Sequence, residues 1–331
     1  MPTPLPMPVP PLHWDTHALQ EQLDPVLPGL SVEVVERTAS TNTALLDRAR
    51  ATGATEPADG MPATVRRSVE SAAFGPRAAD VLPCLLVAEQ QTGGRGRQGR
   101  TWHSVSGASL TFSLAVSLQV SDWSGLSLAV GVALADALDP WAPDPTRRDR
   151  NRYIGLKWPN DLWCIDGEGV GRKLGGILIE TVVTGASRLA VIGIGLNVQP
   201  MVLSDASAAS EASAGFASLQ ELDPAATAPG VLRQVALPLA QVLRQFESEG
   251  FAAFAERFAA RDLLRGHPVR TTQPDVPEGV AQGVSAQGAL LVQTSSGLKP
   301  VSSGEVSVRL DSLAARPPAR QADAPAVPPP C

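Results

Sequence analysis

The amino-acid sequence predicts an α/β or α+β domain followed by a small β-barrel. Up to residue 264, segments with the two-residue period of strands alternate with segments of helical spacing. Over residues 265–311, short β-type runs are instead separated by glycines. The chain has 331 residues, whereas a single core rarely grows beyond roughly 250. We therefore expect a larger domain over 31–264 and a barrel over 265–311.

The first part of the chain is expected to contain one strand and one helix. Residues 1–30 begin with prolines alternating with apolar residues and are expected to be a disordered lead-in. Ser31–Arg37 alternates in the manner of a strand, and a helix is expected to open at residue 40 and to continue to Arg50. Residues 51–83 have no sustained period, which indicates an insertion.

The next part is expected to alternate strand, loop, strand and helix. Cys84–Ala88 is an apolar run typical of a buried strand, and it leads into a glycine–arginine loop over Gly93–Arg100. Leu110–Leu118 has bulky apolar residues on one face and small residues on the other, which predicts a half-buried strand. Trp123–Leu138 then has helical spacing.

The rest of the chain is expected to add four strands, two helices and the barrel. The strands are Tyr153–Trp158, Leu162–Ile165, Lys173–Val183 and Arg188–Val198, and the helices are Val231–Gln245 and Phe251–Leu264. The Ala/Ser-rich stretch 199–230 is expected to be a loop. The barrel shows four β-type runs (PVRTT, GVAQGVSA, GALLVQT and GEVSVRL), and the proline-rich tail 312–331 is expected to be disordered.

Composition and charge exclude several classes of protein. A net charge of −6 disfavours binding to nucleic acid through a broad basic face. The longest apolar helical stretch, Leu126–Leu138, is shorter than the ~20 residues that span a bilayer. Cys84, Cys164 and Cys331 are scattered and lack CxxC spacing, which is atypical of a disulfide framework or a zinc site. We expect a cytoplasmic protein without a membrane anchor.

The strongest local feature is the segment Gly93–Trp102 (GGRGRQGRTW), in which Arg95, Arg97 and Arg100 are interleaved with glycines. Glycines let backbone amides approach an anion, and guanidinium groups donate paired hydrogen bonds to carboxylate or phosphate. The segment also matches G-x-G-x-x-G, but a strand and not a helix follows it, which disfavours a dinucleotide-binding fold. An anion site for a small molecule is favoured, and an RGG-like contact with RNA stays open.

Two polar segments have a structural and a functional interpretation. Lys157–Asp161 (KWPND) is first a proline turn, but a lysine at the end of an apolar strand could also contact an α-phosphate. Ser40–Asn42 (STN) is first a helix cap, and its hydroxyl and amide groups could also hydrogen-bond a polar ring.

Glycines recur within two of the predicted strands. Gly175 and Gly176 enter one apolar strand, and Gly193, Gly195 and Asn197 lie on one face of another. Glycine inside a strand usually marks a bulge, tight packing or the close approach of a ligand. For either strand alone, tight packing and a ligand stay equally open, whereas the two bare faces together favour a flat ligand slot.

Taken in this order, five motifs resemble those of the biotin–protein ligase family. They are Ser40–Asn42, Gly94–Arg100, Lys157–Asp161, Arg172–Glu180 and Gly193–Asn197. The resemblance covers about residues 31–311. It implies an α+β fold: a class II aminoacyl-tRNA-synthetase-like catalytic domain, with a mixed β-sheet flanked by helices, and a C-terminal SH3-like β-barrel.

The resemblance also implies an activity and a partner. The activity is ATP-dependent formation of biotinyl-5′-AMP with release of pyrophosphate, followed by transfer of biotin to a lysine. The implied partner is the biotin carboxyl carrier protein of acetyl-CoA carboxylase or of a similar biotin-dependent carboxylase. Biotin and ATP are the implied substrates, and Mg²⁺ is the implied metal, with ligands that the sequence does not identify.

Residue roles follow from the same resemblance. Biotin binding is implied for Ser40, Thr41, Asn42, Gln91, Arg95, Gly96, Arg97, Lys157, Gly176 and Gly193. Binding of ATP or the adenylate is implied for Arg97, Arg100, Trp102, Lys157 and Asn197. Lys157, Arg95 and Arg97 are the implied catalytic residues, because positive groups stabilise the negative charge that develops at the phosphate.

Some members of the family carry an N-terminal DNA-binding winged helix and act as repressors. Only about thirty residues precede the first predicted strand here, so we expect the type that does not bind DNA; a homodimer is left open. A lipoate–protein ligase and a nucleic-acid-binding module that uses the arginine loop are the alternatives. The GRGRQGR loop and the terminal barrel favour biotin over lipoate.

Overall fold

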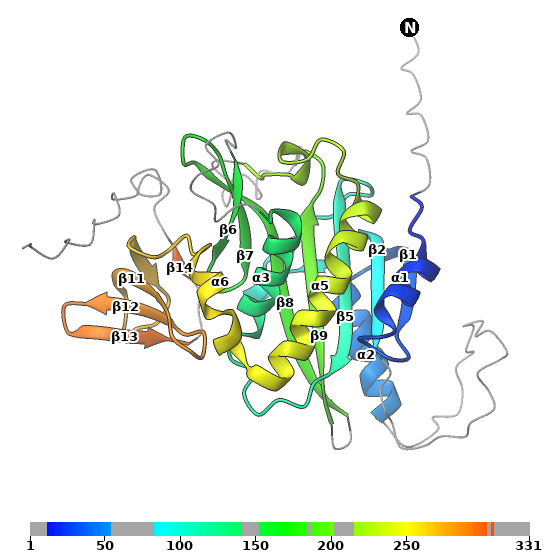
Figure 1. Cartoon of the computed structure of the whole chain (residues 1–331), viewed down its shortest axis with the longest axis horizontal. Helices are drawn as coiled ribbons and strands as arrows, with labels where there is room; N and C mark the ends of the chain where they lie inside the picture. Colours follow the sequence, from blue (N-terminus) through cyan, green and yellow to red (C-terminus); the bar gives the residue numbers. More distant parts are fainter. Residues whose placement is uncertain are drawn as a thin grey trace, which may run out of the picture.

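The computed structural model of the chain describes residues 12–53, 83–140, 152–184, 187–201, 215–302 and 306–307. These residues form a large mixed sheet flanked by helices and, beside it, a small five-stranded sheet (Figure 1). Most of the predicted insertion over 51–83, part of the predicted loop 199–230 and the whole tail 312–331 lie outside the described residues.

Seven strands make the large sheet. They are β1 (Ser31–Thr38), β2 (Cys84–Gln91), β5 (Ser109–Ser117), β6 (Tyr153–Lys157), β7 (Asp161–Ile165), β8 (Gly171–Thr184) and β9 (Ser187–Asn197). Their order across the sheet is β1-β2-β5-β9-β8-β7-β6. β1 and β2 are parallel, which requires a crossover connection, and the other neighbours are antiparallel. The sheet is therefore mixed, as predicted.

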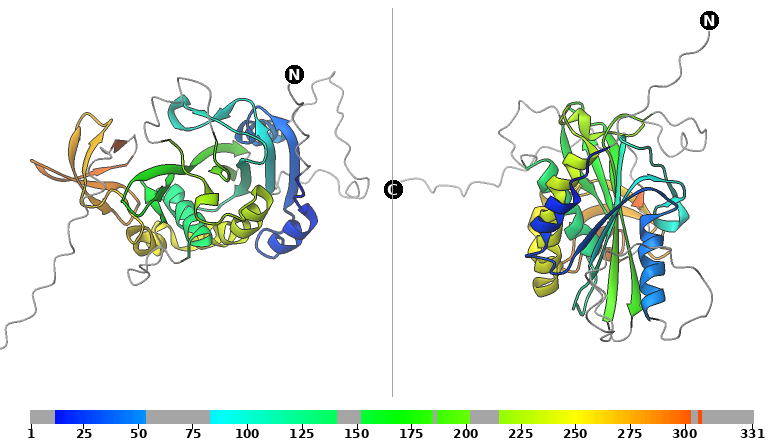
Figure 2. Two further views of the ribbon diagram at one scale, coloured as in Figure 1. Left: turned by 90° about the horizontal axis from the view of Figure 1, so that it is seen from above. Right: turned by 90° about the vertical axis from the view of Figure 1, so that its right-hand side faces the viewer.

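Helices cover both faces of this sheet. They are α1 (Thr16–Leu23), α2 (Thr41–Gly53), α3 (Leu126–Leu138), α5 (Ala228–Glu249) and α6 (Ala255–Ala259). The right-hand view of Figure 2 shows α1, α3 and α5 on one face and α2 on the other. The first layer encloses the main apolar core, whereas α2 buries Leu45 and Leu46 in a smaller cluster with Val191. No helix in the described part of the chain is long and apolar enough to cross a membrane.

β5 is buried on both faces, so the prediction of a half-buried strand is wrong. Phe112 and Leu114 point into the main core, and Thr111 and Ser113 on the opposite face are buried as well. α2 packs across this second face. Residue size alternates along β5 together with polarity, and small residues beneath a helix produce the same period as residues facing water.

The expected lead-in over residues 1–30 is wrong for its second half. This segment contains α1, and its buried residues are Trp14, Leu19, Leu23, Leu27 and Leu30. They belong to the main core. The leucines recur every three or four residues, which is the spacing of one helix face, but the prolines before them obscured that signal.

The two C-terminal helices of the large domain differ from their predicted bounds. α5 begins at Ala228, inside the predicted loop, because Thr227 caps it and a proline follows in its first turn. The helix predicted over Phe251–Leu264 is instead a 3₁₀ turn, η4 (Phe251–Phe254), followed by the short α6. The chain after α6 runs beside β6, where Leu156 N donates to Arg261 O at 2.8 Å.

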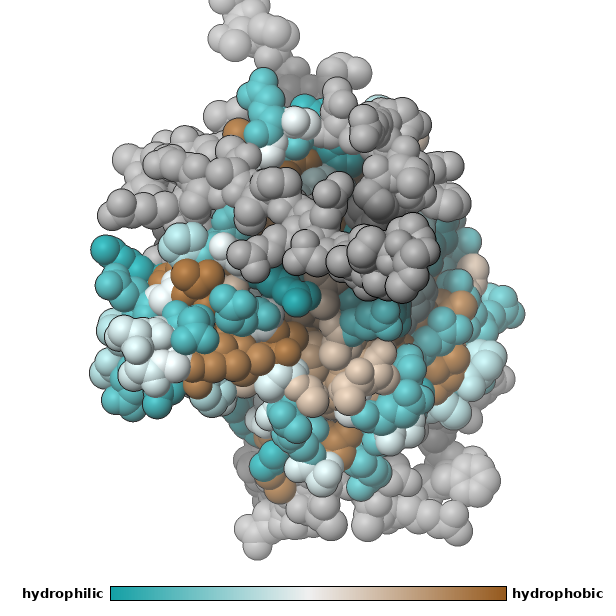
Figure 3. Space-filling model, turned by 60° about the vertical axis from the view of Figure 1, so that its left-hand side comes forward, coloured by the Kyte–Doolittle hydropathy of each residue, from teal (hydrophilic) through white to brown (hydrophobic). Residues whose placement is uncertain are grey.

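The small sheet follows directly. Its strands are β10 (Pro268–Thr271), β11 (Glu278–Val284), β12 (Leu290–Thr294), β13 (Gly297–Val301) and β14 (Val306–Ser307), in the order β13-β12-β11-β10-β14. β13 was not predicted. Trp158 Nε1 donates to Gly288 O at 3.0 Å and joins this barrel to the turn after β6. Figure 3 looks onto this side, where hydrophobic residues are interrupted by hydrophilic ones; Val280 and Leu298 are exposed apolar residues of the barrel.

Candidate active site

All the candidate site residues line one cavity. It has a volume of about 530 Å³ and lies on the sheet face where α2 begins. The lining includes Ser40, Thr41, Asn42, Gln91, Arg95, Gly96, Arg97, Arg100, Trp102, Lys157, Gly176, Gly193 and Asn197. The structure therefore brings together Gln91, Trp102 and residues of all five motifs. Their individual roles stay predictions.

Hydrogen-bonding groups from different elements meet at the start of α2. Ser40 Oγ accepts from a backbone N–H in the first turn, so the expected cap is present. Thr41 donates from its backbone N and its Oγ1 to Gln91 Oε1, at 2.7 and 3.1 Å. Ser113 Oγ lies 2.6 Å from both Thr41 Oγ1 and Asn42 Oδ1. These groups are largely buried, so the cluster holds its geometry before any ligand binds.

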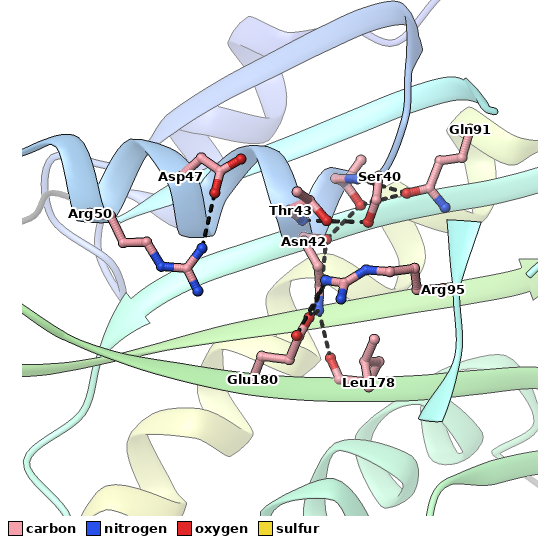
Figure 4. A network of polar contacts seen from close by, with 11 residues as sticks. Ser40, Asn42, Thr43, Asp47, Arg50, Gln91, Arg95, Leu178 and Glu180 are labelled. Carbon is pink, nitrogen blue, oxygen red and sulfur yellow. Dashed lines mark hydrogen bonds and ion pairs between the residues drawn. The ribbon is translucent and has the colours of Figure 1, made fainter. Parts of the chain in front are cut away.

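Glu180 of β8 connects this cluster to the arginine segment (Figure 4). Asn42 Nδ2 donates to Glu180 Oε2 at 2.9 Å and to Leu178 O at 3.2 Å. Arg95 Nη2 donates to both carboxylate oxygens of Glu180, at 2.9 and 3.2 Å. The Arg95 side chain is 43% exposed and that of Glu180 28%, so water reaches the pair and screens it.

The glycine–arginine segment is a small hairpin. Its parts are β3 (Gly94–Arg95), the 3₁₀ turn η2 (Arg97–Gly99) and β4 (Thr101–Trp102). Gly96 N donates to Arg100 O at 2.7 Å and closes the turn. Gln98 has a φ of 54°, a left-handed conformation that side chains rarely adopt. The turn places Arg97 and Arg100 at the cavity.

The bare strand face on β9 is confirmed, but protein side chains fill the space above it. A Cβ on Gly193 would lie 2.9 Å from Asn42 Cγ, and a Cβ on Gly195 would lie 2.8 Å from Trp102 Nε1. Tight packing against Asn42 and Trp102 therefore accounts for both glycines, and both also line the cavity. The ligand slot stays a prediction. Gly176 on β8 differs, because the nearest atoms to a Cβ there would be 3.6 Å away.

Lys157 ends β6 at the edge of the cavity. Its Nζ lies 4.5 Å from the centroid of the Trp163 ring, a cation–π contact. Asn160 ties the following turn to β8, because Asn160 Nδ2 donates to Ile177 O at 2.8 Å and Ile177 N donates to Asn160 O at 2.9 Å. The motif is thus a turn, as its simpler interpretation predicts, and it also places a cation at the cavity.

Polar contacts also anchor the other side of the cavity. Lys173 Nζ pairs with Asp161 Oδ1 at 2.9 Å, and Asp161 is the carboxylate among the described lining residues. Asn197 is 3% exposed, and its Nδ2 donates to the carbonyls of Lys173 and Ala217 at 3.4 and 3.1 Å. The amide nitrogen of Asn197 therefore joins two backbone segments, and its adenylate role stays a prediction.

Comparisons with known proteins identify the family. The model of the biotin/lipoate A/B protein ligase family matches residues 83–197, and that of the biotin protein ligase C-terminal domain matches residues 266–309. The biotin–[acetyl-CoA-carboxylase] ligase of Mycobacterium tuberculosis is 32% identical over 314 residues, which are 90% of this chain and 96% of that protein. The chain belongs to the biotin–protein ligase family.

Other biotin–protein ligases match over different shares of their length. The bifunctional ligase/repressor BirA of Escherichia coli is 35% identical over 231 residues, so this chain spans 65% of that protein. The biotin protein ligase from Aquifex aeolicus, solved in complex with biotin and ATP, superposes with a TM-score of 0.60 at 24% identity. It covers 84% of this chain and 98% of its own. The predicted α+β fold with a C-terminal barrel is confirmed.

Some residues in and around this cavity were not predicted as site residues. Ser113 and Glu180 lie on strand faces that point to the cavity side, and alternation from Gly176 could have indicated Glu180. A buried hydroxyl such as Ser113 carries no comparable signal. The barrel also contributes to the lining, through Arg270, Thr271 and Thr272. Contacts between domains leave no periodicity in a sequence, so these residues could not be anticipated.

Proposed function

We propose that the chain is an ATP-dependent biotin–protein ligase. It forms biotinyl-5′-AMP from biotin and ATP, releases pyrophosphate, and transfers biotin to a lysine of a biotin carboxyl carrier protein. The observation that carries the proposal is that one cavity is lined both by hydrogen-bonding groups at the start of α2, its hydrogen-bonding end, and by the cations of the arginine hairpin and Lys157, its cationic end. Biotin has groups that match both, a polar ureido ring and a carboxylate.

The hydrogen-bonding end suits an uncharged ring that both donates and accepts. Ser40, Thr41, Asn42 and Gln91 bring hydroxyl and amide groups to this end from α2 and β2. Their mutual hydrogen bonds fix them in place, which lowers the ordering cost of binding. Gly176 lines the same cavity without a side chain, and the ring of biotin would lie against this surface.

The cationic end suits the first chemical step. A biotin carboxylate oxygen bonds to the α-phosphorus of ATP, and the bond from that phosphorus to the leaving pyrophosphate oxygen breaks. Arg95, Arg97 and Lys157 can stabilise the negative charge that develops in this step. Arg100 and Trp102 would contact the nucleotide from β4 and the adjoining turn. By analogy with an oxyanion-hole donor, losing one such cation should raise the barrier by about 2.7–4 kcal/mol.

The second step requires no nucleophile from this chain. The amine of the carrier lysine attacks the acyl carbon, the bond from that carbon to the AMP oxygen breaks, and the lysine proton passes to solvent. Burial raises the pKa of Cys164 to about 11, so this thiol stays protonated near neutral pH and is a poor nucleophile.

Mg²⁺ would neutralise phosphate charge when it is bound with ATP. The donor set fits such an ion, because Mg²⁺ usually takes one or two carboxylates together with phosphates and water, and Asp161 lines the cavity. No group of three His, Cys, Asp or Glu side chains within the described ranges could hold a metal ion. Phosphate oxygens would therefore supply ligands beside Asp161.

The carrier and the compartment belong to the same proposal. The relatives from Mycobacterium tuberculosis and Paracoccus denitrificans are named as biotin–[acetyl-CoA-carboxylase] ligases. We therefore expect the carrier to be that of acetyl-CoA carboxylase or of a similar carboxylase. The free thiols of Cys84 and Cys164 support a reducing, cytoplasmic environment. Sedimentation with and without biotin and ATP would decide whether the protein forms a homodimer.

The test measures biotin-dependent pyrophosphate release and transfer of labelled biotin to a carrier domain. Arg97→Ala and Lys157→Ala should each lower pyrophosphate release by about 10²–10³-fold. Arg48→Ala is the matched control, since Arg48 pairs with Glu33 at the surface away from the cavity. Wild-type rates in both cavity variants would contradict the site. Transfer of lipoate in place of biotin, or salt-sensitive retention on nucleic acid without pyrophosphate release, would contradict the function.

A further inference from the structure

We propose that Glu180 is a positioning residue that sets which groups donate and which accept around the ring of biotin. This inference rests on the proposed function. Glu180 lies on the same face of β8 as Gly176 and Leu178, which line the cavity, but it does not line the cavity itself. It acts through two residues that do, Asn42 and Arg95.

Glu180 fixes the orientation of the Asn42 carboxamide. An ionised carboxylate only accepts hydrogen bonds, whereas a carboxamide has one accepting and one donating end. Asn42 must therefore turn Nδ2 toward Glu180 Oε2, 2.9 Å away, and Leu178 O, a second acceptor at 3.2 Å, favours the same orientation. Asn42 Oδ1 consequently faces Ser113 Oγ at 2.6 Å.

The orientation of Asn42 affects the rest of the cluster through Ser113. Ser113 has one hydroxyl hydrogen, and it lies between two acceptors, Asn42 Oδ1 and Thr41 Oγ1, each 2.6 Å from Ser113 Oγ. Because Thr41 Oγ1 accepts from Ser113, it directs its own hydrogen to Gln91 Oε1, which also accepts from Thr41 N. Gln91 is left with Nε2 as its donating end. If the Asn42 carboxamide were flipped, Nδ2 would face Ser113 and the donors and acceptors of the cluster would change. The charge of Glu180 also polarises the hydrogen bonds that follow it in the chain.

The same carboxylate also holds the arginine hairpin. Arg95 uses Nη2 for Glu180, and a guanidinium has further N–H donors on Nε and Nη1. Glu180 therefore restricts Arg95 without consuming all of its donors. Glu180 thus fixes which groups donate and which accept at the hydrogen-bonding end, and it connects that end to Arg95 of the cationic end. It should therefore favour a ligand with the hydrogen-bond donors and acceptor of the biotin ureido ring.

The experiment compares Glu180→Gln with the wild type by biotin-dependent pyrophosphate release. Glutamine keeps the shape but can donate, so the KM for biotin should rise about tenfold to a hundredfold, while the KM for ATP stays within about twofold. Discrimination between biotin and 2-iminobiotin, in which NH replaces the ureido oxygen, should also fall. Glu33→Gln is the matched control, because Glu33 is another strand glutamate paired with an arginine, Arg48, at 2.8 Å.

Two further variants distinguish positioning from general destabilisation. Glu180→Asp keeps the charge and should retain selectivity against 2-iminobiotin that Glu180→Gln loses. Ser113→Ala removes the group that Asn42 Oδ1 faces. The increase in the KM for biotin in the double variant Ser113→Ala/Glu180→Gln should therefore be smaller than the product of the increases in the two single variants. The inference would be overturned if Glu180→Gln left the KM for biotin unchanged, or if both Glu180 variants lost selectivity against 2-iminobiotin equally. It would also be overturned if the effects of Ser113→Ala and Glu180→Gln on the KM for biotin were independent. Absence of biotin-dependent pyrophosphate release in the wild type would instead contradict the proposed function.

Discussion

Gly193→Ala tests whether close packing beneath Asn42 is what requires a glycine in β9. The new methyl carbon would lie 2.9 Å from Asn42 Cγ and closer still to Oδ1. Ordinary carbon contacts begin near 3.5 Å, so Asn42 would have to retreat by about 1 Å. That shift would weaken its hydrogen bonds with Ser113 and Glu180. Overpacking costs about 1–3 kcal/mol, and each weakened hydrogen bond adds about 0.5–1.5 kcal/mol.

We therefore expect Gly193→Ala to lower the free energy of unfolding by about 2–6 kcal/mol. The kcat/KM for biotin should fall by about 10²-fold, the typical result of a 1 Å misplacement. Urea denaturation and biotin-dependent pyrophosphate release measure the two effects. Gly176→Ala is the control for stability, because its Cβ would meet no atom closer than 3.6 Å. If Gly193→Ala unfolds at the wild-type urea concentration and uses biotin equally well, the packing argument is wrong.

Two further predictions concern the junction between the domains. Trp158→Phe removes the hydrogen bond to Gly288 O and should lower the free energy of unfolding by about 1–3 kcal/mol in urea denaturation. Trp163→Phe is the control, because the buried Nε1 of Trp163 has no hydrogen-bond partner among the described residues, and it should lower the free energy of unfolding by less. A larger decrease in Trp163→Phe than in Trp158→Phe would contradict this prediction. Burial raises the pKa of Asp262 from 3.8 to about 6, so the folded state binds this proton more tightly than the unfolded chain. The contribution of Asp262 to stability should therefore fall by about 2 kcal/mol as pH rises from 4 to 6. The difference in unfolding free energy between the wild type and Asp262→Asn measures this fall, and a constant difference over that range would refute it.

The strands of the large sheet could be predicted because their signal is local. β2, β6, β7 and β9 each combine apolar runs with turn residues at their ends, and their observed bounds lie close to the expected ones. The layer that covers a strand is not a local property. β5 therefore looked half-buried, since its sequence does not reveal that α2 lies over its second face.

The candidate site could be predicted in its members but not in its connections. Each motif has local chemistry that attracts attention, such as the arginines of the β3–β4 hairpin or the lysine that ends β6. The contacts that join them extend across the chain: Asn42 meets Glu180 138 positions away, and Arg95 meets it 85 positions away. Separations of this size produce no period or spacing that a single sequence displays.

The glycines show how far residue type alone can be interpreted. A glycine in a strand indicates that something approaches the backbone closely, and this holds at both Gly193 and Gly195. What approaches them is Asn42 and Trp102, two residues that line the cavity. The bare face of β9 thus packs against part of the cavity wall, whereas a Cβ at Gly176 on β8 would meet no atom closer than 3.6 Å. Glycine is needed both where a protein side chain packs against a strand and where a ligand approaches it. Only the side chains opposite the glycine distinguish the two cases.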